Sequence, residues 1–232
     1  MYTKKHAGTS VAVYEKLKDQ ILHLELPPGS AISEIETAEK YEMSRTPVRD
    51  AFKMLEREGL LEIRPHIGTF VSLIDLKTVS DILYMREILE QAVYRDLAIS
   101  HDKSQEFHVR LILQQQFDLL DAGLSEDELA RAFVQSDNAF HRTLYELAGK
   151  GAVIDFISGI HSQYERFRTF LNFTDHEYLL RLCNDHRNIW ECIASQDYDK
   201  LADLISHHIY DGFNSSAEVV HQHPEYFKFV RQ

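Results

Sequence analysis

The stretch Tyr41–Gly59, YEMSRTPVRDAFKMLEREG, decides the interpretation of the first part of this chain. Ser44 is placed to cap a helix, and Pro47 is tolerated in a first helical turn, where backbone N–H groups have no intrahelical partner. Beyond that start, apolar residues recur at the spacing of one helix face, at Val48, Ala51, Phe52 and Leu55. The stretch therefore predicts an amphipathic helix.

The opposite face of this helix is cationic. Arg45, Arg49 and Lys53 follow one another at intervals of four residues. A helix that buries one face and presents a row of cations on the other is suited to an anionic partner, and duplex DNA is the first candidate. The alternative is a basic face that is merely solvated.

The segments on either side of the helix favour DNA. A first helix is expected over residues 10–24, and Ser33 is expected to begin a short second one, with Glu36 in capping-box position and Ile35 and Ala38 facing inward. Two short helices joined by a tight turn are typical of a helix-turn-helix. After Gly59, two β-prone runs flank residues 65–68 and predict a hairpin, which makes the unit a winged helix-turn-helix.

Three motifs in order, LPPGSAISE, MSRTPVRDAF and LEREGLLEIRPHIGTFVS, make residues 10–72 resemble the winged helix-turn-helix of the GntR superfamily of bacterial transcription regulators. The resemblance implies that Arg45 and Arg49 contact the operator and that Ser44 and Thr46 contact phosphates. His66 and Gly68 would form the tip of the wing. Lys53 joins this DNA-binding set because it extends the cationic row.

Charge divides the 232-residue chain unequally. The formal net charge is −12, of which residues 1–74 contribute −1 and residues 75–232 contribute −11. We therefore expect a DNA-binding domain over 1–74, attached to an acidic body over 75–232. No apolar run approaches a membrane span, the N-terminus lacks the apolar stretch of a secretory signal, and Cys183 and Cys192 are spaced too far apart on one helix to form a disulfide. A cytoplasmic protein with no membrane partner is expected.

The second domain is expected to be an all-α antiparallel bundle of about six helices, so the fold class is mainly α. The expected helices cover residues 75–100, 104–122, 125–148, 151–172, 176–195 and 198–220.

Polar residues fall on the apolar faces of three of these helices, at Asp137, His141, His186 and His208. Buried ionisable groups require a partner, and one carboxylate with three imidazoles suits Zn²⁺ first, with Ni²⁺ or Mn²⁺ as alternatives. The other interpretation is an ordinary Asp–His hydrogen bond with two unrelated histidines.

The segments SDNAFHRTLYELAG, NDHRNIWECIASQDYDKL and ISHHI resemble the FCD domain of FadR-type GntR regulators, an all-helical ligand-binding domain. The resemblance implies that Asp137, His141, His186 and His208 are the metal ligands. It also places an arginine at Arg86, on an inward face, where it would bind an effector carboxylate. The alternative for Arg86 is an ion pair with Glu87, Glu90 or another acidic neighbour.

Together these patterns predict a homodimeric, metal-containing transcription regulator that binds a pseudo-palindromic operator on double-stranded DNA. A small organic acid would release this repressor from its operator. Two alternatives stay open: a metalloenzyme that activates water at the Asp/His site, and a regulator whose metal is purely structural.

Overall fold

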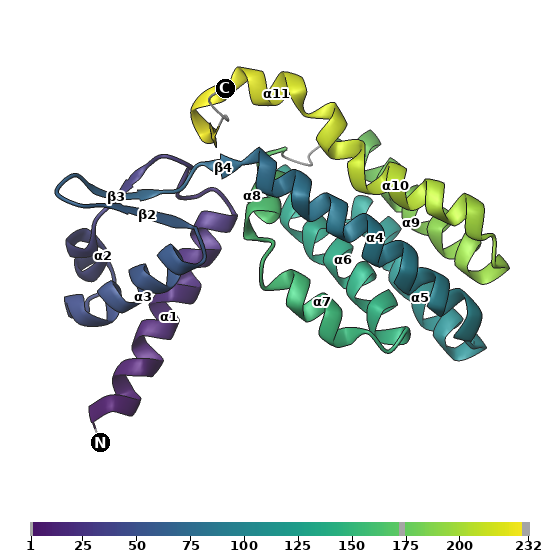
Figure 1. Cartoon of the computed structure of the whole chain (residues 1–232), viewed down its shortest axis with the longest axis horizontal. Helices are drawn as coiled ribbons and strands as arrows, with labels where there is room; N and C mark the ends of the chain where they lie inside the picture. Colours follow the sequence, from purple (N-terminus) through teal and green to yellow (C-terminus); the bar gives the residue numbers. More distant parts are fainter. Residues whose placement is uncertain (1, 172–174, 229–232) are drawn as a thin grey trace. The chain divides into compact units, whose positions relative to one another are not determined.

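The computed structural model describes residues 2–171 and 175–228, which form two compact units (Figure 1). Unit 1 comprises the chain up to Val79, Ile160–Phe170 and the chain from Glu218 onward. Unit 2 comprises Ser80–Gly159 and Leu171–Ala217. The predicted domains are two continuous stretches of chain that meet between residues 74 and 75. The compact units are not continuous, because two later segments belong to unit 1.

Unit 1 begins as a winged helix-turn-helix. Its elements in chain order are α1 (Tyr2–Leu22), β1 (Ala31–Ile32), α2 (Glu34–Lys40), α3 (Arg45–Arg57), β2 (Leu61–Arg64) and β3 (Gly68–Val71). The strands form one antiparallel sheet in the order β1-β3-β2, with Ile63 opposite Thr69. In Figure 1 the tip of the β2–β3 hairpin and the N-terminal end of α3 lie at the same end of the unit.

The core of unit 1 uses the apolar face predicted for α3. Val48, Ala51, Phe52 and Leu55 are fully buried, and they pack in one cluster with Leu17 and Ile21 of α1. Ser33 caps α2 by accepting hydrogen bonds from the backbone N–H groups of Ile35 and Glu36. The prediction that Ile35 faces inward is wrong, because its side chain is 44% exposed and Thr37 is buried on α2 instead.

A helix from the later part of the chain completes unit 1. The predicted helix over 151–172 is wrong as one element: it is divided into α7 (Gly151–Ser158) and α8 (Ser162–Phe170) at Gly159, a residue with low helix propensity. On α8, the fully buried Arg166 donates hydrogen bonds to the hydroxyl and the carbonyl oxygen of Ser72, which follows β3. Burial lowers the pKa of Arg166 to about 10. Unit 1 therefore depends on a side chain supplied 94 residues after its partner.

The end of the described chain also belongs to unit 1. The predicted helix over 198–220 is divided at Ser216 into α10 (Tyr198–Ser215) and α11 (Ala217–Gln222). The hydroxyl of Ser216 donates a hydrogen bond to the carbonyl of Phe213, and such local bonds compete with the regular helix. A 3-10 turn (Pro224–Tyr226) leads into β5 (Phe227–Lys228), which pairs in parallel with β4 (Ile74–Asp75). Strand β5 was not predicted, because two residues are too few to show a strand pattern.

Unit 2 is a helical bundle, as predicted. It contains α4 (Leu76–Ser100, from Ser80 onward), α5 (Lys103–Leu120), α6 (Glu126–Leu147), α7, α9 (His176–Ser195) and α10. Figure 1 shows α4, α5, α6, α9 and α10 running alongside one another. The two cysteines are free and buried on α9. Among the described residues, we find no helix with an apolar stretch long enough to cross a bilayer.

Candidate metal centre and DNA-binding helix

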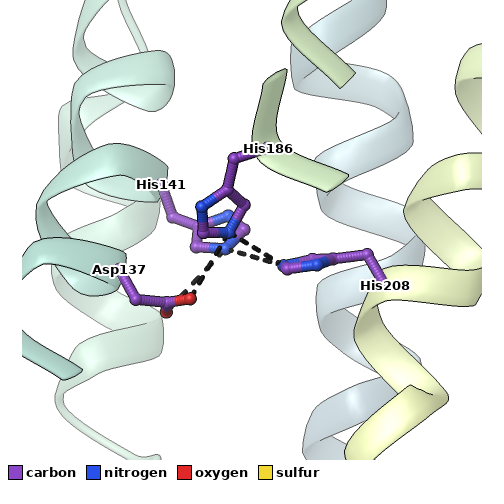
Figure 2. Close-up of side chains that lie close together, drawn as sticks. All are labelled: Asp137, His141, His186 and His208. Atoms are coloured by element: carbon purple, nitrogen blue, oxygen red, sulfur yellow. Dashed lines mark hydrogen bonds and ion pairs between the residues drawn. The ribbon is translucent and has the colours of Figure 1, made fainter. Parts of the chain in front are cut away.

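Four buried side chains from three helices meet inside unit 2 (Figure 2). Asp137 and His141 lie one turn apart on α6, His186 lies on α9 and His208 lies on α10. Their apolar neighbours on each helix face, such as Phe140 and Ile189, are fully buried, so helix packing carries the polar groups inward. The structure brings together all four residues predicted as metal ligands.

The donor atoms are spaced as ligands of one small cation would be. Nε2 of His208 lies 3.2 Å from Nε2 of His186 and 3.3 Å from Nε2 of His141. The carboxylate of Asp137 lies 3.4 Å from Nε2 of His186 and 3.9 Å from Nε2 of His141. Four donors that bind Zn²⁺ tetrahedrally at 2.0–2.1 Å are about 3.3 Å apart.

Outer partners fix which ring nitrogen carries the proton. Nδ1 of His186 lies 2.9 Å from Oε1 of Gln116, whose own amide nitrogen donates to the carbonyl of Ser136. Because an amide oxygen only accepts, His186 carries its proton on Nδ1 and turns the Nε2 lone pair toward the centre.

The same reasoning applies to His141. Its Nδ1 lies 3.2 Å from a carboxylate oxygen of Glu90 and 2.8 Å from the hydroxyl of Tyr94, both on α4.

Nδ1 of His208 lies 3.6 Å from a carboxylate oxygen of Asp185. The Nε2 lone pairs of His186 and His141 therefore both point at Nε2 of His208. That nitrogen carries at most one proton, so it can donate a hydrogen bond to only one of the two. A cation at this point would satisfy all three rings, so the donor set fits a divalent metal.

Burial keeps the imidazoles in the neutral form that a metal requires. Burial lowers the pKa of His186 to about 3, with the neighbouring His208 acting in the same direction and Asp137 opposing it. Burial and Arg86 also lower the pKa of His141, against the pull of Glu90. At neutral pH both rings therefore have free lone pairs.

Arg86 takes the alternative role considered for it. Its Nε lies 2.7 Å from Oε1 of Glu90, and both side chains are buried. Burial opposes ionisation of Glu90, but the charge of Arg86 and the hydrogen bond from His141 hold the pKa of this carboxyl well below its usual range. Glu90 therefore stands as a carboxylate between the arginine and a candidate metal ligand.

Sequence reasoning named Glu90 only as a possible ion-pair partner of Arg86, and it did not identify the other outer partners of the histidines, Tyr94, Gln116 and Asp185. A signal existed only for Glu90, which lies one turn after Arg86 on the same helix. Sequence reasoning also missed Tyr145, a fully buried residue whose hydroxyl has no hydrogen-bond partner among the described residues. The ring of Tyr145 lies edge-on to that of Tyr94, 6.1 Å between centroids, so this hydroxyl is part of the same buried region.

The DNA-binding residues predicted on α3 are exposed, as a DNA contact requires: Ser44, Arg45, Thr46, Arg49 and Lys53. Ser44 is the N-cap of α3, but its side chain makes no capping hydrogen bond. Nε of Arg49 lies 3.1 Å from a carboxylate oxygen of Glu34 on α2, a contact that the sequence did not indicate. The exposed guanidinium of Arg49 therefore has an acidic neighbour on α2, in a contact that water or DNA can replace.

The predicted wing tip is also exposed. His66 lies in the turn between β2 and β3, Gly68 is the first residue of β3, and both have positive φ, 63° and 149°. The backbone N–H of Ile67 closes the turn on the carbonyl of Arg64 at 3.1 Å. The hairpin therefore presents backbone and a histidine side chain at its tip.

Comparison with protein families matches nearly the whole chain. Residues 9–71 match the model described as bacterial regulatory proteins, gntR family, and residues 81–211 match the FCD domain. The chain is 31% identical to an uncharacterised HTH-type transcriptional regulator in an unstable DNA locus of Streptomyces ambofaciens, over 93% of this chain and 88% of that one. It is 28% identical to the HTH-type transcriptional repressor RspR of Escherichia coli K12, over 93% and 92% of the two chains.

Solved structures share the fold. E. coli McbR/YncC superimposes with a TM-score of 0.68 over 93% of this chain and 98% of its own, at 16% identity. A GntR regulator from Rhodococcus sp. RHA1 gives a TM-score of 0.65 over 91% and 97%, at 19% identity. At these identities the similarity concerns the fold alone.

Proposed function

Because this chain belongs to the gntR family of bacterial regulatory proteins and carries an FCD domain, it is a DNA-binding transcriptional regulator, and we propose that unit 2 is its metal-dependent sensor. The convergence of three imidazole Nε2 atoms and the Asp137 carboxylate carries this proposal. The family membership confirms the predicted winged helix-turn-helix and FCD domain.

Asp137, His141, His186 and His208 would hold the metal, with Zn²⁺ as the first expectation. Bound there, a divalent cation would supply a Lewis-acidic centre that attracts the carboxylate of a small ligand. Gln116 and Glu90 orient two of the imidazoles through their Nδ1–H groups. Arg86 holds Glu90 in the ionised form, so it acts on the centre through that carboxylate.

The effector that we propose is a small organic acid. A carboxylate oxygen is a common ligand of Zn²⁺, and the hydroxyl of Tyr145, which has no hydrogen-bond partner among the described residues, offers a hydrogen bond in the same buried region. Direct contact between Arg86 and the acid stays a prediction, because the structure shows this arginine paired with Glu90.

On the DNA, we propose that a homodimer places the exposed face of each α3 in a major groove. The exposed guanidinium of Arg49 is suited to bidentate contact with a guanine, which would replace its contact with Glu34, and Arg45 and Lys53 are suited to contacts with phosphates. His66 and Gly68 would place the wing against the backbone. We propose repression that is relieved by the acid, which requires that the acid bind more tightly to one arrangement of the protein.

Titration of the metal-loaded protein with a panel of small carboxylates tests the proposal. Thermal stability, turnover of the acid and release from operator DNA in a gel-shift assay are followed together. Release without turnover is the expected result. Turnover would indicate a metalloenzyme, and the absence of any response with metal bound would indicate a structural metal.

A further inference from the structure

Helix α4 has an outward face that the proposed sensor does not use. The buried face of the helix carries Glu90 and Tyr94 toward the histidine centre. On the outward face, successive turns expose Asp81, Tyr84, Ile88, Ala92 and Arg95. Tyr84 is 60% exposed and Ile88 48%, although both are large apolar side chains. We call these five residues the α4 stripe.

A groove accompanies the stripe. A cavity of about 470 Å³ lies where α4 meets α10, lined by residues that include Ile88, Gln91, Ala92, Arg95, Tyr198 and Leu201. Gln91 fixes its floor, because its amide nitrogen donates to the hydroxyl of Ser206, 3.1 Å away on α10. The guanidinium of Arg95 lies over the ring of Tyr198, 5.2 Å from the centroid. The groove is therefore a formed feature of unit 2.

We propose that the α4 stripe is the contact surface between two copies of this chain, packed antiparallel about a two-fold axis at Ile88. In such an isologous contact, residues equally distant from the axis face each other. Asp81 of each copy then faces Arg95 of the other, which gives opposite charges at both ends of the contact.

Side-chain size supports the same register independently of charge. Tyr84 of one copy faces Ala92 of the other, so a large ring meets a small residue at the edge of the groove. Ile88 meets itself at the axis. Moving the axis by one turn toward either end would place Ile88 opposite Ser80 or Asp96 and would lose both matches.

Two exposed apolar positions on α5 offer a comparison. Phe107 and Leu111 are 71% and 49% exposed. Arg110, which lies between them, pairs within α5, because one of its guanidinium nitrogens lies 2.9 Å from a carboxylate oxygen of Glu106. The inference about α4 rests on the proposed homodimer, and its test separates the two.

Sedimentation equilibrium of the full chain tests the surface. Ile88→Arg is expected to weaken the dimer at least 100-fold, since it buries two cations at the axis. Asp81→Arg and Arg95→Asp are each expected to weaken it about tenfold, and the double charge swap is expected to restore it. Phe107→Arg, at a still more exposed apolar position on α5, is the control and is expected to dimerise as the unsubstituted chain does. Circular dichroism and metal content verify that each variant folds.

The outcomes distinguish the surface from the dimer. If the unsubstituted chain and all α4 variants dimerise equally, the α4 surface is overturned while the homodimer stands. Single substitutions that disrupt the dimer without rescue by the charge swap overturn the proposed register. Dissociation by Phe107→Arg alone would move the interface to α5. A monomeric unsubstituted chain that binds operator DNA as one copy overturns the homodimer itself.

Discussion

Arg49 on α3 and His186 on α9 are both candidate binding residues, but 58% of the Arg49 side chain is exposed whereas His186 is fully buried. The exposed arginine makes one contact that water could replace, so its loss removes a function and little stability. The buried histidine belongs to a network in which each polar group needs its partner, so its loss changes both. The two sites therefore predict different signatures for substitution.

His186→Ala is expected to produce the largest effect. Removing one of four ligands and leaving the amide oxygen of Gln116 without its donor should lower metal affinity by more than about 100-fold. Elemental analysis after dialysis measures metal content, and the melting temperature should no longer respond to added Zn²⁺. His207→Ala, which removes the exposed neighbour of His208, is the control and should behave as the unsubstituted chain does. Full metal retention by His186→Ala would show that the ligand set is wrong.

Arg49→Ala is expected to separate function from stability. A bidentate contact to a guanine contributes about 1–3 kcal/mol, and a dimer would lose two, so operator affinity should fall roughly 30-fold or more. Metal content and melting temperature should not change. Lys53→Ala offers the comparison, because losing a phosphate contact weakens binding to operator and random DNA alike. Unchanged operator affinity in a gel-shift titration would remove α3 from the DNA-reading role.

Glu90→Gln tests whether the buried network acts beyond the four ligands. The substitution keeps the shape of the side chain but removes the charge that faces His141 and Arg86. Metal affinity is expected to fall about 10-fold to 100-fold, measured by competition with a chelator. Glu87→Gln, on the same helix but bonded to Ser206 of α10, should leave the affinity unchanged. Equal affinities in the two variants would contradict an outer role for Glu90.

Acidification should produce the smallest effect, and it is measured on the metal-free protein so that loss of metal at low pH does not contribute. The pKa of His186 is lowered to about 3, while an unfolded histidine titrates near 6.5. Between these values the unfolded chain binds more protons than the native one, so stability falls as pH falls. From pH 7.5 to pH 5.5 this residue alone should remove about 1 kcal/mol of unfolding free energy, measured in urea. His186→Ala should lose this component.

The exposed site was more accessible from sequence than the surroundings of the buried one. The apolar and cationic faces of α3, which carry Val48 and Arg49, can be predicted from residue spacing, because both faces belong to one helix. The inward phase of Asp137, His186 and His208 was visible for the same reason. Gln116 was not, since a glutamine in a run of three gives no sign of burial, and its contact with His186 joins residues 70 positions apart. A contact that depends on packing between helices cannot be predicted from the residue pattern of either helix.

The hydrogen bonds from Arg166 to Ser72 bear on the order in which the protein is made. A ribosome delivers the helix-turn-helix first, but α8 leaves the exit tunnel only after α4, α5, α6 and α7 have been synthesised, and β5 emerges last. A nascent chain that stops at Val79 has α3 in full, yet it lacks the buried arginine at the base of the wing. Unit 1 is thus completed only after the chain of unit 2 has been synthesised. A truncated translation product would therefore lack a complete DNA-binding unit.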